Sequence, residues 1–288
     1  MKRLLRLISI ALGSIVGLGI VAYAVVYVLS ERMLRRIYPV SAVALSIPTD
    51  PPSIAEGRRL ATIYGCFNGC HGKAAEGHVL FDEPMIARIV APNLTAVVRQ
   101  YSDAQIAVAV RSGIRPDGRS LIVMPAEAFA GMTDEDLGRI IAFLKSLPSV
   151  TGPDPSVFLG HFLGPLGRVG LVAGKFKTVA QLVADGVPPS EATSQEANFG
   201  RYVARTICAQ CHGTNLHGAS TPDFSSPDLR IVTAYSLKAF TDLMRMGVAL
   251  WRRKLGVMNA WAVKNLSHLT DAEIAAVYSY LHAEVTQN

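Results

Sequence analysis

Residues 208–212 read Cys208-Ala209-Gln210-Cys211-His212. The C-x-x-C-H pattern is typical of covalent c-type haem attachment. Residues three apart share one face of a helix, so both thiols can bond to one porphyrin edge, and His212 follows as the proximal iron ligand. A C-x-x-C pair alone can be a redox dithiol or half of a zinc site. The adjacent histidine and the helical stretch from Asn198 to Ile207 favour haem.

A second cysteine pair lies far upstream and departs from this pattern. Residues 66–71 read Cys-Phe-Asn-Gly-Cys-His, with three residues between Cys66 and Cys70 ahead of His71. An i, i+4 pair still shares a helical face, and Asn68-Gly69 can absorb the extra residue as a bulge or left-handed turn. We predict a second haem c at this pair. A Cys66 to Cys70 disulfide and attachment through one thiol are the alternatives.

A methionine thioether is expected as the second axial ligand of each iron. Met124, which precedes Pro125, is the candidate in the first half of the chain, and Met258 is the candidate in the second half. Two rivals, Met244 and Met246, have a helical spacing that favours core packing. The other rivals are Met85, Met132, His217 and His268.

The two cysteine pairs lie in related blocks, at residues 53–148 and 196–288. Each block opens with a helix-like stretch that ends in the cysteines, continues through loop-rich sequence containing a methionine, and closes with a capped helix. Residues 133–136 and 270–273 each place a threonine three residues before an acid, which predicts a capping box. The chain is therefore expected to hold an internal duplication, joined by a Gly- and Pro-rich linker at residues 149–195.

An uncharged apolar run from Leu7 to Leu29 precedes the first block. As a helix it spans roughly 35 Å, enough to cross a bilayer. Residues 1–36 are therefore predicted to be a membrane anchor with basic flanks, followed by a proline-containing spacer at residues 37–52. A cleavable signal peptide is the alternative, because Ala22-Tyr23-Ala24 offers small residues, but the apolar run continues beyond them.

The formal net charge of +6 belongs mostly to this anchor. Residues 1–36 carry six basic residues against Glu31, a net of +5 that leaves +1 for the rest. Basic flanks of an apolar span lie among lipid headgroups, so nucleic acid is not an expected partner. A smaller basic group precedes Met258 and is either a rim that steers an acidic redox partner or a solvated helix face. Its members are Arg245, Arg252, Arg253 and Lys254.

Together, the two C-x-(2 or 3)-C-H blocks, each with a downstream methionine and a terminal helix, resemble tandem class I cytochrome c domains. Ala91-Pro92-Asn93-Leu94-Thr95 and the stretch from Met124-Pro125 to Leu147-Pro148 resemble cytochrome c subunits of bacterial membrane dehydrogenases. The resemblance implies an all-α fold of two such domains plus one N-terminal transmembrane helix. It also implies helix crossings at Gly57 with Phe143 and at Gly200 with Tyr278.

The resemblance implies two covalently bound haem c groups and no catalytic residue. Haem attachment of this kind occurs outside the cytoplasm, so we expect a single-pass inner-membrane protein whose haem domains face the periplasm. Its expected role is to carry single electrons from a quinol-oxidising complex or dehydrogenase to a terminal oxidase or soluble cytochrome, with no small-molecule substrate. The alternatives are a dihaem peroxidase or thiosulfate-oxidising enzyme, and a fixed electron-transfer subunit of a dehydrogenase complex.

Overall fold

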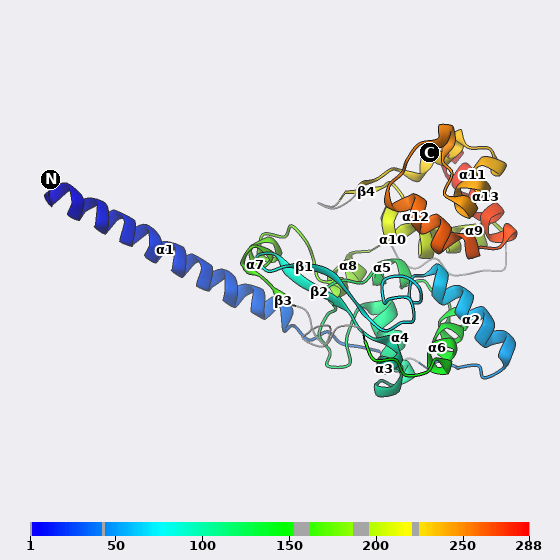
Figure 1. Ribbon diagram of the computed structural model, residues 1–288, viewed down its shortest axis with the longest axis horizontal. Coiled ribbons are helices and arrows are strands. Elements are labelled where there is room, and N and C mark those ends of the chain that lie inside the picture. The colour runs from blue at the N-terminus through cyan, green and yellow to red at the C-terminus, as the bar shows by residue number, and fades with distance from the viewer. Residues whose placement is uncertain (1, 42–43, 153–161, 187–195, 221–224, 288) are drawn as a thin grey trace.

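The computed structural model describes residues 2–41, 44–152, 162–186, 196–220 and 225–287, which are mostly helical. In Figure 1 one long helix projects from two groups of shorter helices. We call residues 44–152 the first body and residues 196–287 the second body. One continuous cluster of buried apolar side chains runs through both bodies, so they share a core.

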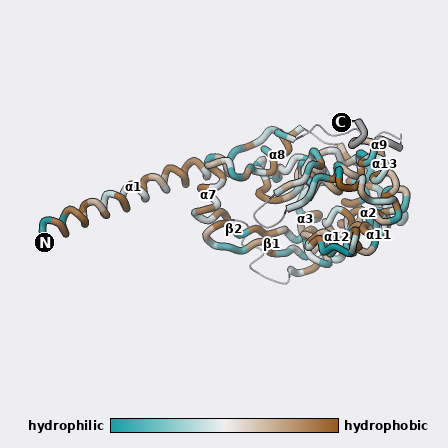
Figure 2. The backbone as a smooth tube through the Cα atoms, turned by 90° about the horizontal axis from the view of Figure 1, so that it is seen from above, coloured by the Kyte–Doolittle hydropathy of each residue, from teal (hydrophilic) through white to brown (hydrophobic). Residues whose placement is uncertain are grey.

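Helix α1 (Lys2–Leu34) contains the apolar run and is the described helix that is long and apolar enough to cross a membrane. Its side chains are exposed along almost its whole length, and Figure 2 shows it as largely hydrophobic. This confirms the prediction of one membrane-length helix at the N-terminus. A signal sequence near the N-terminus passes the same test of length and composition.

The first body is built from five helices. Its opening helix begins at Pro51, because Asp50 caps it by accepting a hydrogen bond of 2.9 Å from the Ser53 backbone N–H and proline suits a first helical turn. Its closing helix is capped by Thr133, whose Oγ1 accepts from the Asp136 N–H at 3.1 Å. The predicted capping box is only half formed, because the Thr133 N–H bonds instead to the Tyr202 hydroxyl, which donates to Asp136. The five are α2 (Pro51–Ile63), α3 (Leu94–Gln100), α4 (Asp103–Ser112), α5 (Ala126–Phe129) and α6 (Asp134–Ser146).

The second body follows a similar order. Thr270 caps the closing helix, and both bonds of the predicted capping box form: Thr270 Oγ1 accepts from the Glu273 N–H at 3.1 Å, and Glu273 accepts from the Thr270 N–H at 2.6 Å. Helices α9 (Glu196–Val203), α10 (Ala209–His212), α11 (Leu237–Met246), α12 (Val257–Lys264) and α13 (Asp271–Gln287) are joined by a π-helical turn (Ala204–Cys208) and by 3-10 turns at Leu229–Ala234, Leu250–Arg252 and Leu266–His268.

In both bodies the opening helix crosses the closing helix at a glycine. A Cβ at Gly57 would overlap the Arg139 carbonyl oxygen and lie 3.1 Å from the Phe143 Cβ, so the predicted contact with Phe143 is confirmed. A Cβ at Gly200 would overlap the Ala276 carbonyl oxygen and lie 3.0 Å from the Tyr280 Cβ. The second crossing is therefore at Ala276 and Tyr280, and the prediction of Tyr278 was wrong.

Tyr278 lies two residues from Tyr280, so it leaves α13 in another direction. Its hydroxyl donates a hydrogen bond of 2.9 Å to the Tyr235 carbonyl, and its ring stacks obliquely on His282. The Tyr278 side chain therefore links α13 to the end of the 3-10 turn at Leu229–Ala234.

Short strands accompany the helices, so the all-α expectation describes the helical majority and misses a sheet. Strands β1 (His78–Glu83), β2 (Ala87–Ala91) and β3 (Phe162–Leu163) pair antiparallel in that order. Strands β4 (Ala219–Ser220) and β5 (Ser225–Ser226) form a smaller pair in the second body. A register irregularity between Val79 and Phe81 interrupts β1, which breaks the alternation by which strands are recognised in a sequence.

The segments predicted as spacer and linker are packed along the first body. The backbone N–H of Tyr38 bonds to the Gly118 carbonyl at 2.9 Å, and Leu45 and Ile47 pack on the core. The described part of the linker holds β3, α7 (Pro165–Val172), which packs on α1, and α8 (Val179–Asp185). Thr178 and Gln181 form the capping box of α8, so the linker holds a short helix as well as loops.

Candidate haem sites

In chain order, Cys66 and Cys70 are the first pair and Cys208 and Cys211 are the second pair. The second pair follows an opening helix whose last turn is widened. Helix α9 passes into the π-helical turn that ends at Cys208, and α10 then carries Cys211 and His212. Gly213 ends α10 with φ of +76°. Single π turns inside helices occur frequently at functional sites because they reset which residues share a face. The helical lead-in predicted from the sequence is confirmed, and its π turn was not predicted.

His212 is oriented by the backbone. Only 8% of its surface is exposed, and its Nδ1 lies 2.8 Å from the Pro227 carbonyl oxygen. A carbonyl can only accept, so Nδ1 carries the proton and the Nε2 lone pair is left available for a metal. Burial lowers the pKa of His212, which also favours the neutral imidazole. The side chain therefore has the tautomer that an axial iron ligand requires.

His71 in the first pair is held in the same way. Its Nδ1 lies 2.9 Å from the Pro92 carbonyl oxygen, and burial lowers its pKa. Pro92 follows strand β2 as Pro227 follows β5, so each proline lies just after a strand of a hairpin. Both histidines therefore present a neutral imidazole with Nε2 available.

The loop after each histidine repeats from one body to the other. The Gly77 N–H bonds to the His71 carbonyl at 2.8 Å, and the Gly218 N–H bonds to the His212 carbonyl at 2.9 Å. Four residues after each histidine, a residue other than glycine has a positive φ: Ala75 at +61° and Leu216 at +64°. Such a conformation is costly for a side chain with a Cβ, so its occurrence at matching positions indicates a common loop structure.

The extra residue between Cys66 and Cys70 is absorbed in a turn. Helix α2 ends at Ile63, so Cys66 lies beyond it, and the expectation that both thiols share a helical face was wrong. Asn68 has φ of +56°, as predicted for a left-handed turn, and the Cys70 N–H bonds to the Gly65 carbonyl at 2.9 Å. This tight turn accommodates the extra residue between the end of α2 and His71.

The four thiols are free, and the two pairs are neighbours. Burial raises the pKa of Cys66 to about 12 and that of Cys208 to about 12. The pKa of Cys211 is raised by burial and then by the charge of Cys70, which belongs to the other pair. The ring of Trp261 lies against Gly65 beside the first pair, so α12 of the second body reaches the first site.

The candidate axial methionines are both half-buried and packed against the common core. Met124 lies in the loop just before α5, whereas Met258 lies in the first turn of α12 and not in a loop. Among the rivals, Met132 and Met244 are buried core residues and Met85 and Met246 are exposed. His217 lies 3.4 Å from Asp228.

The basic group before Met258 is smaller than expected. Arg245 donates to the Ser267 carbonyl and lies 2.7 Å from Asp271, so its charge is paired within the second body. Arg252, Arg253 and Lys254 are exposed and make no ion pair among the described residues. They follow Trp251, which is 89% exposed. An exposed rim of three cations remains.

The residues around the cysteine pairs suit a haem. Each site offers two thiols and one oriented imidazole, and the described residues hold no group of three or more His, Cys, Asp and Glu arranged for a bare metal ion. Buried nitrogen atoms without a partner lie on the helix and π turn that lead to Cys208, at the Nε of Arg201 and of Arg205. Guanidinium donors of this kind suit the propionate carboxylates of a haem.

Sequence comparison identifies the family of the second body: residues 199–283, which include Cys208, Cys211 and His212, match the cytochrome c family. These residues are therefore a cytochrome c domain, whose chemistry is electron transport with covalently bound haem. The chain is also homologous to cytochrome c subunits of membrane dehydrogenases.

Two kinds of relative show this homology. The fructose dehydrogenase cytochrome subunit of Gluconobacter japonicus is 24% identical over 296 residues, which cover 87% of this chain and 60% of that protein. The cytochrome c subunits of alcohol dehydrogenase (quinone) from Gluconacetobacter polyoxogenes and Komagataeibacter europaeus are each 26% identical over 204 residues, 65% of this chain and 43% of those proteins. The chain thus spans about half the length of these relatives.

Proposed function

We propose that this chain is a dihaem electron carrier. One haem is held by Cys66, Cys70 and His71, and the other by Cys208, Cys211 and His212. The main support for a haem at Cys66, Cys70 and His71 is the repeated loop, in which each histidine is fixed by a proline carbonyl and followed by the same backbone turn. A disulfide between Cys66 and Cys70 would not require the same loop in both bodies. On this basis residues 53–148 and 196–288 are two cytochrome c domains joined by residues 149–195.

Met124 and Met258 are proposed as the second axial ligands. Both are half-buried at the edge of the core, whereas their methionine rivals are either fully packed or exposed. A thioether is a soft ligand that favours the reduced iron and raises the potential. If Met124 and Met258 bind the iron together with the histidines, no coordination position would be left for a substrate, which favours an electron carrier over a haem enzyme.

The bound haem supplies one-electron redox chemistry, and the chain supplies fixed positions for it. The histidines are held in one tautomer by backbone carbonyls, and Cys66 and Cys208 pack against the shared core. Contacts between the bodies fix their separation: Tyr64 Oη and Thr206 Oγ1 are 3.0 Å apart, and Asn265 Nδ2 donates to the Thr62 carbonyl at 2.6 Å. Two sites held this close favour transfer of an electron between them.

Residues 1–36 are proposed to remain as a single inner-membrane anchor, with both domains in the periplasm. The proposed electron donor is a membrane dehydrogenase or quinol-oxidising complex, and the acceptor is a terminal oxidase or soluble cytochrome. The names of the relatives support a dehydrogenase as the donor. A second form of the proposal is that this chain is a permanent subunit of such a dehydrogenase complex. Arg252, Arg253 and Lys254 offer a basic contact for an acidic partner.

A haem count tests the proposal. The full chain, produced with haem-attachment machinery, is expected to keep two haems per chain after acid-acetone extraction, measured as the pyridine haemochrome. The Cys66→Ala/Cys70→Ala variant and the matched Cys208→Ala/Cys211→Ala variant should each keep one. A single haem in the wild type, retained by the first variant and lost by the second, would show that the Cys66 pair is not an attachment site.

A further inference from the structure

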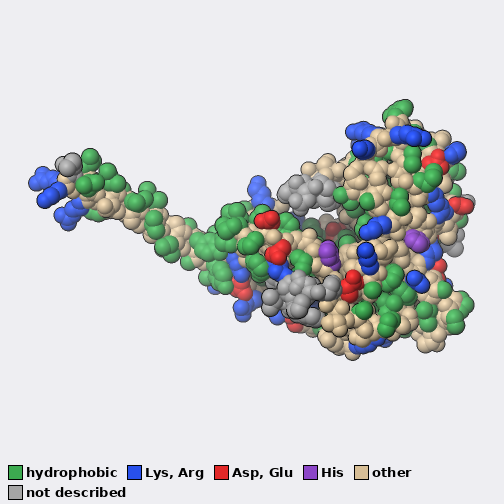
Figure 3. Space-filling model, in the orientation of Figure 1, with side chains coloured by type: hydrophobic (Ala, Val, Ile, Leu, Met, Phe, Trp, Pro, Cys, Tyr) green, Lys and Arg blue, Asp and Glu red, His purple; other side chains and the backbone are tan. Residues whose placement is uncertain are grey.

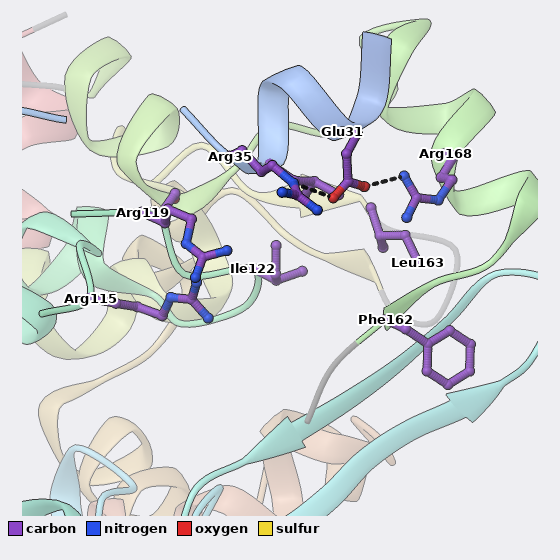
Figure 4. A pocket seen from close by; sticks show the side chains of 10 residues that line it. Glu31, Arg35, Arg115, Arg119, Ile122, Phe162, Leu163 and Arg168 are labelled. Carbon is purple, nitrogen blue, oxygen red and sulfur yellow. Dashed lines mark hydrogen bonds and ion pairs between the residues drawn. The ribbon is translucent and has the colours of Figure 1, made fainter. Parts of the chain in front are cut away.

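A basic pocket lies where α1 joins the first body, far from the haem sites. It has a volume of 220 Å³ and is walled by the end of α1, the loop after α4, β3 and α7. Its charged lining residues are Glu31, Arg35, Arg115, Arg119 and Arg168. Figure 4 shows Arg115 and Arg119 on one side of the pocket, Arg168 on the other, and Glu31 between Arg35 and Arg168.

The carboxylates nearby do not balance these cations. Glu31 forms ion pairs with two guanidinium groups, those of Arg35 at 2.7 Å and Arg168 at 3.0 Å. Asp117 likewise forms ion pairs with both Arg115, at 3.0 Å, and Arg119, at 2.8 Å. Four cations thus share two carboxylates. The Nε of Arg115 is also buried without a partner, so a donor is available.

The pocket lies at the depth of lipid headgroups if α1 spans the membrane. The apolar run ends at Leu29, only about 3 Å of helix rise before Glu31. Arg168 stacks on Tyr27 with its guanidinium carbon 4.2 Å from the ring centre, in the region of a membrane helix where aromatic side chains are enriched. On that placement of α1, the cations lie at the level of the lipid phosphates.

Apolar side chains surround this junction. Figure 3 shows hydrophobic side chains gathered where α1 meets the rest of the molecule. Five large ones in the β1–β2 turn, β3 and α7 are exposed: Met85, Ile86, Phe162, Leu166 and Val169. Exposed apolar groups next to a cationic pocket suit an interface that is apolar on one side and phosphate-rich on the other.

We propose that this pocket binds the phosphate of an anionic phospholipid and seats the first body on the membrane surface. The planar forks of Arg115 and Arg119 suit the oxygens of a phosphodiester. The inference rests on the proposed membrane anchor, and it adds a lipid site to it.

Native mass spectrometry of the full, haem-loaded chain in mild detergent tests this site. Phosphatidylglycerol is expected to bind about tenfold more tightly than phosphatidylcholine, and Arg115→Gln/Arg119→Gln should remove that preference. The control Lys238→Gln/Lys264→Gln removes the same charge from the exposed surface of the second body and should leave binding unchanged. Haem content and the reduced absorption spectrum, measured on the same samples, report separately on the proposed function.

Asp117→Asn gives a test in the opposite direction, since it frees both arginines without removing a cation. It should tighten phosphatidylglycerol binding. Equal binding of both lipids, or an unchanged affinity in both the double variant and Asp117→Asn, would overturn the proposal. So would displacement of the lipid by an equal concentration of inorganic phosphate, because the site would then be one for free anions.

Discussion

His71 and His212 illustrate how single backbone contacts prepare a metal ligand. In each case a proline carbonyl accepts the Nδ1 proton and leaves Nε2 free. This hydrogen bond fixes the tautomer and the orientation of the ring before any metal binds. The sequence singled out both histidines as candidate ligands but not their carbonyl partners, because Pro92 and Pro227 become neighbours only through hairpins that the sequence pattern did not show.

Replacement of Met258 by histidine tests whether this methionine is the second ligand of one haem iron. Imidazole stabilises the ferric state more than a thioether does, so Met258→His should lower the midpoint potential of one haem and leave that of the other unchanged. Met124→His should do the same for the other haem. Potentiometric titration followed by absorbance measures both.

Met244→Leu and Met132→Leu are the controls for that experiment, because both residues are buried in the core. They should change the free energy of unfolding slightly and leave both potentials unchanged. A potential that shifts in a control, but not in the histidine variant of the same body, would reassign the ligand.

Asp136 gives a prediction for pH. Burial raises the pKa of this carboxyl above its usual 3.8 despite a 2.5 Å hydrogen bond from the Tyr202 hydroxyl. Arg139 opposes this shift, and Glu135 and Glu56 add to it. The folded state therefore holds the proton more tightly than the unfolded state, so stability is highest below pH 4 for this group and falls as the pH rises through the raised value.

Asp136→Asn should remove that fall, which is measured as the free energy of unfolding by denaturant between pH 4 and pH 7. Asp134→Asn is the matched control, because Asp134 lies on the same helix with an exposed side chain. If both variants show the same pH dependence as the wild type, burial of Asp136 does not influence stability.

At the scale of the helix, the two crossings depend on the absence of a side chain. A methyl group at Gly57 or at Gly200 would overlap a carbonyl oxygen of the closing helix, and backbone atoms cannot move aside cheaply. Gly57→Ala and Gly200→Ala should each lower the free energy of unfolding by about 2 kcal/mol or more, through overpacking.

Gly19→Ala is the comparison for these variants, since a Cβ there meets nothing within 4 Å. Denaturant unfolding of the three proteins, followed by the absorbance of the bound haem, gives the free energies. Equal stability of all three would mean that the opening and closing helices do not cross at these glycines.

Capping patterns located the closing helices well, because a threonine and an acid three residues later determine a helix start locally. The crossing residue on α13 could not be found the same way. Ala276 and Tyr280 are separated by one turn and Tyr278 lies between them, so the choice depends on how far the helix is rotated about its axis. That rotation is set by packing on α9, which involves residues far away in the sequence.

For the whole molecule, the bodies are connected by buried polar contacts as well as by a common core. Asn265 is completely buried and donates to the Thr62 carbonyl, while Arg59 lies 2.8 Å from Glu273. We expect one cooperative unfolding transition for the haem-loaded chain. Asn265→Ala should lower its midpoint, because the Thr62 carbonyl loses its donor at a cost of about 1 to 3 kcal/mol.

Scanning calorimetry checks this coupling, and Asn259→Ala provides a control within the second body, since its side chain bonds to Gly247 of the same body. Two separate transitions in the wild type would contradict the shared core. Neither the core nor these contacts could be predicted from the sequence, where the two blocks are distinct and a Gly- and Pro-rich segment separates them.

The bond between Tyr64 and Thr206 joins corresponding positions, because each residue stands two places before the first cysteine of its block. The Thr206 hydroxyl also donates to the Tyr202 carbonyl, so it accepts from Tyr64. Two flanking contacts involve the acid in the first turn of each closing helix: Arg59 of one opening helix meets Glu273, and Tyr202 of the other meets Asp136. On the duplication proposed here, a contact between corresponding residues such as Tyr64 and Thr206 is what an isologous interface between two copies of one domain produces.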